Sequence, residues 1–222
     1  MKLLQKNKFL IISCFVFFLF SKGFSETINF KADSMKGSMG ENNNKTILEG
    51  KAWIETETIE LFADKITLSG KDYDSIYAEG NVKGSYKESG FSFACETLDY
   101  NRLVELVILK TNVSIEDFEN NLTATAQIVE YDKKNDVSTM QINVQINHKN
   151  SICTATLAIY KKTEKLLDLS GNPKIIRDND TFSAQEITLN METEEITLDG
   201  KVRGSVVEKK TTEESENQEE NK

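Results

Sequence analysis

The 222-residue sequence predicts an all-β fold of stacked hairpins, with about twelve strands from six repeats of about 30 residues. Three observations predict it. Two columns of small residues recur with the same period, and apolar and polar residues alternate around the second column. No long window keeps apolar residues at the i, i+3, i+4, i+7 spacing of an amphipathic helix. A period of 20–50 residues indicates stacked supersecondary units.

The two columns mark the two arms of each hairpin. The first-arm column is Ala32, Ala63, Cys95, Ala126, Ala155 and Ala184, with spacings of 31, 32, 31, 29 and 29. The second-arm column is Gly50, Gly80, Thr111, Ile142, Gly171 and Gly200, with spacings of 30, 31, 31, 29 and 29. Because two separate columns keep one period, the repeat is a property of the chain.

Each second arm alternates with period two, as a strand with one face in water does. In the second repeat the apolar or small set is Ile76, Ala78, Gly80 and Val82, against Tyr77, Glu79, Asn81 and Lys83. In the first arms the apolar phase slips by one residue after the small anchor. This slip predicts a bulge or corner, with the extra residue in the first arm.

The residue after each first-arm anchor is polar and is predicted to be a corner residue that hydrogen-bonds locally. These residues are Asp33, Asp64, Glu96, Gln127, Thr156 and Gln185. A metal site formed by these residues is the alternative, but only half of the repeats have an acidic residue at this position.

Stacking supplies the core, because a single hairpin cannot bury its apolar face. If equivalent strands are neighbours about 4.8 Å apart, six rungs give a stack about 30 Å long with two facing walls. Both small columns are expected where the walls approach closely, and Ile, Val, Leu and Tyr are expected to line the lumen between them.

The termini are predicted to lie outside this domain, which spans residues 26–207. Residues 1–25 have a basic start, an apolar run from Phe9 to Phe20 and small residues before Glu26, which is typical of a cleaved signal peptide for export to the periplasm. An uncleaved anchor and a lipidated Cys14 are the alternatives. Residues 208–222 are charged and polar and are predicted to be a disordered acidic tail.

Composition argues against several classes of function. The formal charge is −9, and loss of residues 1–25 removes four lysines, which leaves 23 basic and 36 acidic residues, or −13. Nucleic-acid binding is therefore not expected, since it needs clustered cations. Cys95 and Cys153 fall in different columns two repeats apart, so free buried thiols are expected. With His148 as the one histidine, neither an enzyme nor a metal or other cofactor is expected.

The arms also carry a family signature. A [FL]-x-A-D-x-[IM] arm at residues 61–66 is followed by an L-x-G-[NK]-V type arm at residues 78–82. At these columns the sequence resembles the OstA-like family of lipopolysaccharide-export proteins, which includes LptA and the N-terminal domain of LptD. The resemblance covers residues 27–207 and weakens in repeats three to five. It implies a twisted, slightly open β-jellyroll that holds acyl chains and joins other copies or export components end to end.

The residues and the resemblance together predict a periplasmic protein that shields the acyl chains of lipopolysaccharide or a similar glycolipid. The expected lumen residues are Ile66, Leu68, Val82, Leu98, Tyr100, Val113, Val129, Tyr131, Val144, Ile187 and Leu189. Two alternatives stay open: a membrane-tethered relative of LptC, and a structural β-solenoid whose interior is packed solid. The volume of the lumen distinguishes the solenoid from a carrier.

Overall fold

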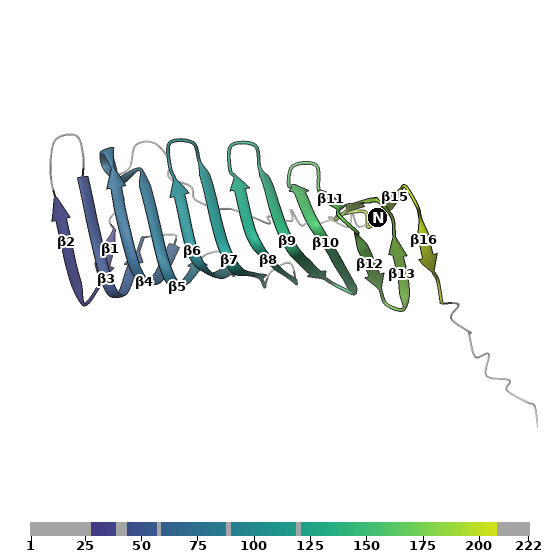
Figure 1. Ribbon diagram of the computed structural model, residues 1–222, viewed down its shortest axis with the longest axis horizontal. Coiled ribbons are helices and arrows are strands. Elements are labelled where there is room, and N and C mark those ends of the chain that lie inside the picture. Colours follow the sequence, from purple (N-terminus) through teal and green to yellow (C-terminus); the bar gives the residue numbers. More distant parts are fainter. Residues whose placement is uncertain (1–27, 39–43, 57–58, 88–89, 119–120, 208–222) are drawn as a thin grey trace, which may run out of the picture.

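The chain folds into one long antiparallel sheet that is creased along its length, as a computed structural model shows (Figure 1). The structure describes residues 28–207, except 39–43, 57–58, 88–89 and 119–120, so the predicted signal peptide and acidic tail lie outside the described residues. Within the described part, no helix is long and apolar enough to cross a bilayer.

Sixteen strands and one short 3₁₀ turn make up the described residues. They are β1 (Asn29–Lys31), β2 (Ser34–Ser38), β3 (Asn44–Glu55), β4 (Ile59–Gly70), η1 (Lys71–Tyr73), β5 (Ser75–Tyr86), β6 (Phe91–Asn101), β7 (Leu106–Asp117), β8 (Leu122–Asp132), β9 (Val137–His148), β10 (Ser151–Lys161), β11 (Leu166–Ser170), β12 (Lys174–Arg177), β13 (Asp180–Ser183), β14 (Glu186–Asn190), β15 (Ile196–Asp199) and β16 (Arg203–Ser205).

These strands form the twelve arms that the repeats predict. Arms two to nine along the sheet are the single strands β3 to β10, each of 11 or 12 residues. Near both ends, an arm is divided into two short strands at its middle. The divided arms are β1 with β2, β11 with β12, β13 with β14, and β15 with β16.

The order of the strands corrects the predicted stacking. Consecutive arms pair antiparallel, in the order β3-β4-β5-β6-β7-β8-β9-β10, so equivalent arms are two strands apart. Eleven gaps of about 4.8 Å make the sheet about 50 Å long, not about 30 Å. The prediction was wrong because a short hairpin loop brings its own two arms together before it can bring neighbouring repeats together.

Every arm bends where the two small columns lie. In all six second arms, two consecutive residues have positive φ: Gly50–Lys51, Gly80–Asn81, Thr111–Asn112, Ile142–Asn143, Gly171–Asn172 and Gly200–Lys201. The pairing of β3 with β4 steps from Glu49↔Lys65 to Ala52↔Ala63, so two residues of β3 face Asp64 alone. The predicted bulge is therefore present, but the extra residue lies in the second arm.

The glycines of the second column are needed for the bend, and not for a close approach of two walls. Gly80 has φ +78°, and a Cβ there would lie 2.9 Å from the Cβ of Asp64 on the neighbouring arm. A Cβ at Gly50 would lie equally close to the side chain of Asp33. In the first column Ala63, Cys95 and Ala126 are buried, whereas Ala32, Ala155 and Ala184 are partly buried.

The corner residues hydrogen-bond locally, as the sequence predicts. Asn81 Nδ2 donates to Asp64 Oδ2 at 2.8 Å. The Thr156 hydroxyl donates to the Gly171 carbonyl at 2.9 Å, and the amide of Asp33 donates to the Gly50 carbonyl at 2.9 Å.

The crease divides the sheet into two walls, and every arm contributes a segment to each. The first wall runs from the crease to the turns β4–β5, β6–β7, β8–β9, β10–β11 and β14–β15, which form the first rim. The second wall runs to the turns β3–β4, β5–β6, β7–β8, β9–β10 and β12–β13, which form the second rim. Along the first rim, successive turns are joined by backbone hydrogen bonds, such as Arg102 N to Asp74 O at 2.8 Å and Lys133 N to Glu105 O at 3.0 Å.

Candidate functional site

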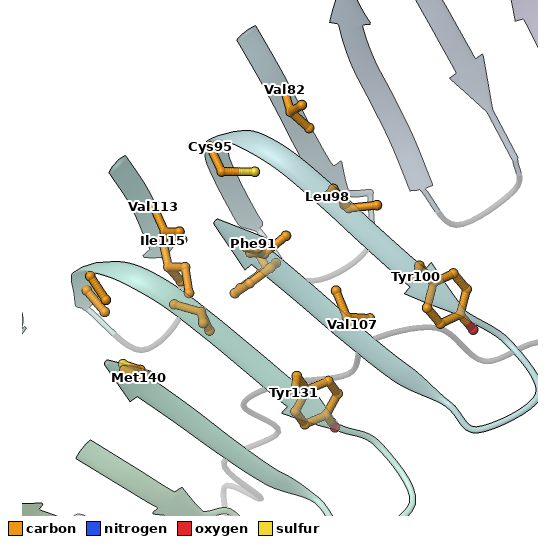
Figure 2. Packing of buried hydrophobic residues seen from close by; sticks show 14 of the residues in the cluster. Val82, Phe91, Cys95, Leu98, Tyr100, Val107, Val113, Ile115, Tyr131 and Met140 are labelled. Carbon is orange, nitrogen blue, oxygen red and sulfur yellow. The ribbon is translucent and has the colours of Figure 1, made fainter. Parts of the chain in front are cut away.

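The space between the two walls is lined by apolar side chains from every repeat. All eleven predicted lumen residues are buried, with exposures from 0% for Ile66 to 6% for Leu68, and all belong to one hydrophobic cluster. Figure 2 shows part of this cluster, with Val82, Cys95 and Val113 on the second wall and Leu98 on the first. The sequence therefore places these residues correctly, while their contact with a lipid stays a prediction.

The predicted set was incomplete on the second wall. Side chains that begin or end the arms at the second rim, among them Ile54, Leu61, Tyr86, Phe91 and Ile115, are buried in the same cluster. The sequence could have identified these residues, because the period-two alternation of apolar and polar residues continues through them to the turn.

The interior between the walls is closed in this structure. A cavity lined by Ile54, Leu61, Phe91 and Phe93 on the second wall and by Leu98 and Tyr100 on the first has a volume of about 30 Å³. One water needs about 10–15 Å³ on this measure, so the cavity has space for about two waters. At this cavity the walls do not leave the open apolar lumen that the sequence predicts. An acyl chain would enter only if the walls move apart.

The thiols and two of the phenols inside stay neutral. Burial raises the pKa of the Cys95 thiol to about 12 and that of the Cys153 thiol to about 11. Both thiols are free and buried, as predicted. Burial also raises the pKa of Tyr100 to about 12, and the pKa of Tyr131 rises through burial and through its hydroxyl bond to Asp136 Oδ1 at 2.7 Å. Neutral thiols and phenols suit an apolar ligand, because a buried charge is costly. Asp117, at the second-rim end of β7, is a carboxyl side chain that is only 4% exposed.

The outer faces are polar and carry ion pairs. Lys65 Nζ lies 3.0 Å from Glu79 Oε1, and Lys161 Nζ lies 3.0 Å from Asp168 Oδ2, both on the outside of the first wall. Trp53 lies on the outer face, between the buried Ala52 and Ile54 in β3, and its indole N–H donates to Glu60 Oε1 at 2.8 Å. The contrast between the faces directs any acyl binding to the interior.

Among the described residues, the terminal arm at each end of the sheet pairs along one edge only. At one end, β1 and β2 pair with β3 within the described residues, and Phe30 and Met35 on them are 50% and 48% exposed. At the other end, β15 pairs with β14 and β16 pairs with β13. Val202 and Val206, beside β16, are 54% and 71% exposed. Unpaired strand edges of this kind are able to add a further strand.

Two further features of the sequence are the possible metal ligands and the histidine. Within the described residues, His, Cys, Asp and Glu side chains form no group of three or more that could hold a metal ion. His148 ends β9 at the second rim, and burial lowers its pKa, with the nearby charge of Lys149 adding to the effect.

Comparison with known proteins identifies a family and finds similar chains among solved structures. A model of the family described as "LptA/(LptD N-terminal domain) LPS transport protein" matches residues 30–195. The search of curated proteins finds no match. Among solved structures, the chain is similar to the crystal structure of LptH, the LptA-homologous periplasmic component of the lipopolysaccharide transport device of Pseudomonas aeruginosa. The identity is 10% and the TM-score 0.24, with 82% of this chain and 96% of that chain covered.

Proposed function

Because the chain belongs to the LptA/LptD N-terminal domain family of lipopolysaccharide transport proteins, we propose that it carries acyl chains of lipopolysaccharide or a similar glycolipid between its two walls. Transit would take place in the periplasm, toward the outer membrane. The observation that supports this function best is the interior itself. It is one continuous apolar cluster, contributed by both walls from β3 to β14.

The energetics favour an acyl ligand once the walls part. Each methylene that leaves water gains about 0.8 kcal/mol. Most inward side chains along the first wall are aliphatic or phenolic, with Ile66 and Leu98 at 0% and 5% exposure, although the hydroxyl residues Thr46 and Ser138 are buried there too. Since the closed cavity has space for only about two waters, the cargo replaces contacts between the walls and does not fill a preformed hole.

Site-specific photocrosslinking in living cells tests this function. A photoreactive residue at Leu98 or Val129 is expected to form adducts with an acyl lipid, because both side chains point inward. The matched control is Asp99, which follows Leu98 on β6 and is exposed on the outer face. Equal labelling from Leu98 and Asp99, or no lipid adduct from either inward position, would contradict the proposal.

A second candidate is favoured by one observation, the closed interior. A structural β-solenoid with a solid core accounts for a cavity of about 30 Å³ without any movement of the walls. The same photocrosslinking experiment separates the two functions, because a solid core gives no lipid adduct at Leu98 under any condition. The membrane-tethered alternative depends on residues 1–27, which lie outside the described residues, and N-terminal sequencing of the mature protein tests it.

We also propose end-to-end association through the terminal arms. The free edges of β1 and β2 and the exposed Phe30 and Met35 support it, because strand addition uses unpaired backbone groups. Sedimentation of the mature chain is expected to show a mass that rises with concentration. The double variant Phe30→Lys/Met35→Lys should remain a monomer, since charges on an edge oppose pairing. Phe118→Lys, at an exposed turn residue away from the ends, is the control and should associate as the wild type does.

A further inference from the structure

The two rims meet near the C-terminal end of the sheet. The turn β14–β15 of the first rim carries Glu194, and the turn β9–β10 of the second rim carries Lys149. Lys149 Nζ lies 2.5 Å from Glu194 Oε1, although 45 residues separate them in the chain. Arg177, which ends β12 at the second rim, donates from Nη1 to the Glu194 carbonyl at 3.3 Å. We call these contacts of Lys149 and Arg177 with Glu194 the clasp.

The clasp is asymmetric in charge. The second rim contributes two cations, whereas the first rim contributes one carboxylate, Glu194, held against Lys149. The hydrogen bond from Lys149 and its charge hold the pKa of Glu194 below its usual range, and Arg177 and His148 act in the same direction. Arg177 is oriented by a second bond, from Nε to Ser151 Oγ at 3.1 Å, and Ser151 is 5% exposed.

The clasp also lies where the apolar interior reaches water. His148, Lys149, Ser151 and Arg177 from the second rim and Leu189 and Glu194 from the first line one small cavity of about 10 Å³. Leu189 is 3% exposed and belongs to the interior cluster. A molecule whose acyl chains occupy the interior at this end would therefore place its polar part beside the two cations.

Separation of the walls changes the charge balance at this point. Glu194 moves with the first rim, while Lys149 and Arg177 remain together on the second rim without its carboxylate. Two like charges at one place attract an anion, and an arginine beside a lysine suits phosphate, which accepts two N–H bonds from the guanidinium and one from the ammonium. Asp178 also lies on this rim, but its Oδ2 accepts from Asn150 Nδ2 at 3.0 Å.

We propose that Lys149 and Arg177 form the binding site for the phosphate of an anionic acyl lipid, and that Glu194 occupies this site as an internal anion while the walls are closed. The inference rests on the proposed function, which it extends from acyl chains to the head group. Exchange of Glu194 for the lipid phosphate then couples loading of the lipid to opening of the rims.

The test compares three probes on the mature full-length chain: dioctanoyl phosphatidic acid, dioctanoylglycerol and inorganic phosphate. Binding is measured by titration calorimetry, and the fold of each variant is checked by thermal unfolding. The wild type should bind phosphatidic acid at least tenfold more tightly than dioctanoylglycerol. Lys149→Met and Arg177→Met should each reduce that ratio at least threefold without weakening the binding of dioctanoylglycerol. Glu194→Gln should tighten the binding of both lipids, because opening of the rims no longer breaks the ion pair with Lys149.

Two controls and the contrary outcomes make the experiment decisive. Lys65→Met removes an ion pair on the outer face and should leave the ratio unchanged, whereas Arg177→Lys should retain part of it. Equal binding of both lipids, or a ratio that Lys149→Met and Arg177→Met leave intact, overturns the phosphate site while the proposed function survives. Failure of both lipids to bind overturns the proposed function itself. Inorganic phosphate that binds as tightly as phosphatidic acid, and depends on the same two residues, would show a site for free phosphate and overturn the lipid assignment.

Discussion

Substitutions at the crease test the claim that the left-handed pair in each second arm bends the sheet. In Gly80→Ala, the new side chain must adopt φ near +78°, which costs about 1–2 kcal/mol for a residue with a Cβ. The Cβ would also lie 2.9 Å from that of Asp64 and displace the side chain that accepts from Asn81, a bond worth about 0.5–1.5 kcal/mol. Replacing glycine also lowers the conformational entropy of the unfolded chain, which offsets about 0.4–1 kcal/mol of this loss. The free energy of unfolding should fall by about 1–2 kcal/mol.

The equivalent position in the third repeat gives the opposite sign. Thr111 has φ +67° and is exposed, so Thr111→Gly removes the left-handed cost and should stabilise the protein by about 0.5–1 kcal/mol. Gly37→Ala is the control, since an added Cβ there makes contacts of 3.5 Å and longer and should be neutral or slightly stabilising. Urea unfolding followed by circular dichroism measures all three. Stabilisation by Gly80→Ala, or destabilisation by Thr111→Gly of more than about 1 kcal/mol, would refute this account of the bend.

Further tests address the interior. Ile66→Ala removes a side chain that is 0% exposed and should lower the free energy of unfolding by about 2–5 kcal/mol. Ile152→Ala, at a residue 40% exposed on the outer face, should lower it by less than about 1 kcal/mol. Similar losses in urea unfolding would show that the two faces are not distinct. Since burial raises the pKa of Cys95 and Cys153, only the unfolded chain loses these thiol protons as pH rises above about 8.5. Stability should then decline by about 1.4 kcal/mol per pH unit for each thiol. A Cys95→Ala/Cys153→Ala variant should lack that slope between pH 9 and 10.5, and identical slopes in both proteins would contradict the burial of the thiols.

The repeat and the alternation were sufficient to predict twelve arms and the inward residues. Every inward side chain of a bent arm must be apolar, and a stack repeats that demand at a fixed period. The slip of phase between Ala63 and Ile66 likewise located the crease correctly, since both are buried on opposite sides of one polar residue, Asp64.

Three features could not be read from these patterns. A phase slip in one arm does not say which partner holds the extra residue, and the left-handed pair at Thr111 and Asn112 has no glycine to reveal it. The period is equally compatible with neighbouring repeats or neighbouring arms as the paired strands. The clasp joins Lys149 to Glu194 across the rims, a contact that depends on how far the walls close and leaves no periodic trace.

A closed interior is physically consistent with a carrier, because the same apolar surface has two ways to leave water. In the closed state, side chains such as Leu98 and Val129 pack against the opposite wall and are 5% and 3% exposed. In a loaded state they would pack against methylenes that gain about 0.8 kcal/mol each by the same burial. The side chains gain little from the exchange, so the net affinity comes from the lipid's own transfer out of water less the cost of parting the walls.

A carrier that must release its cargo to the next copy needs this small difference in free energy. A variant with a larger permanent cavity, such as Ile66→Ala, is therefore expected to hold acyl lipid longer than the wild type in a dissociation assay. Faster release from Ile66→Ala would show that contact between the walls does not compete with the lipid.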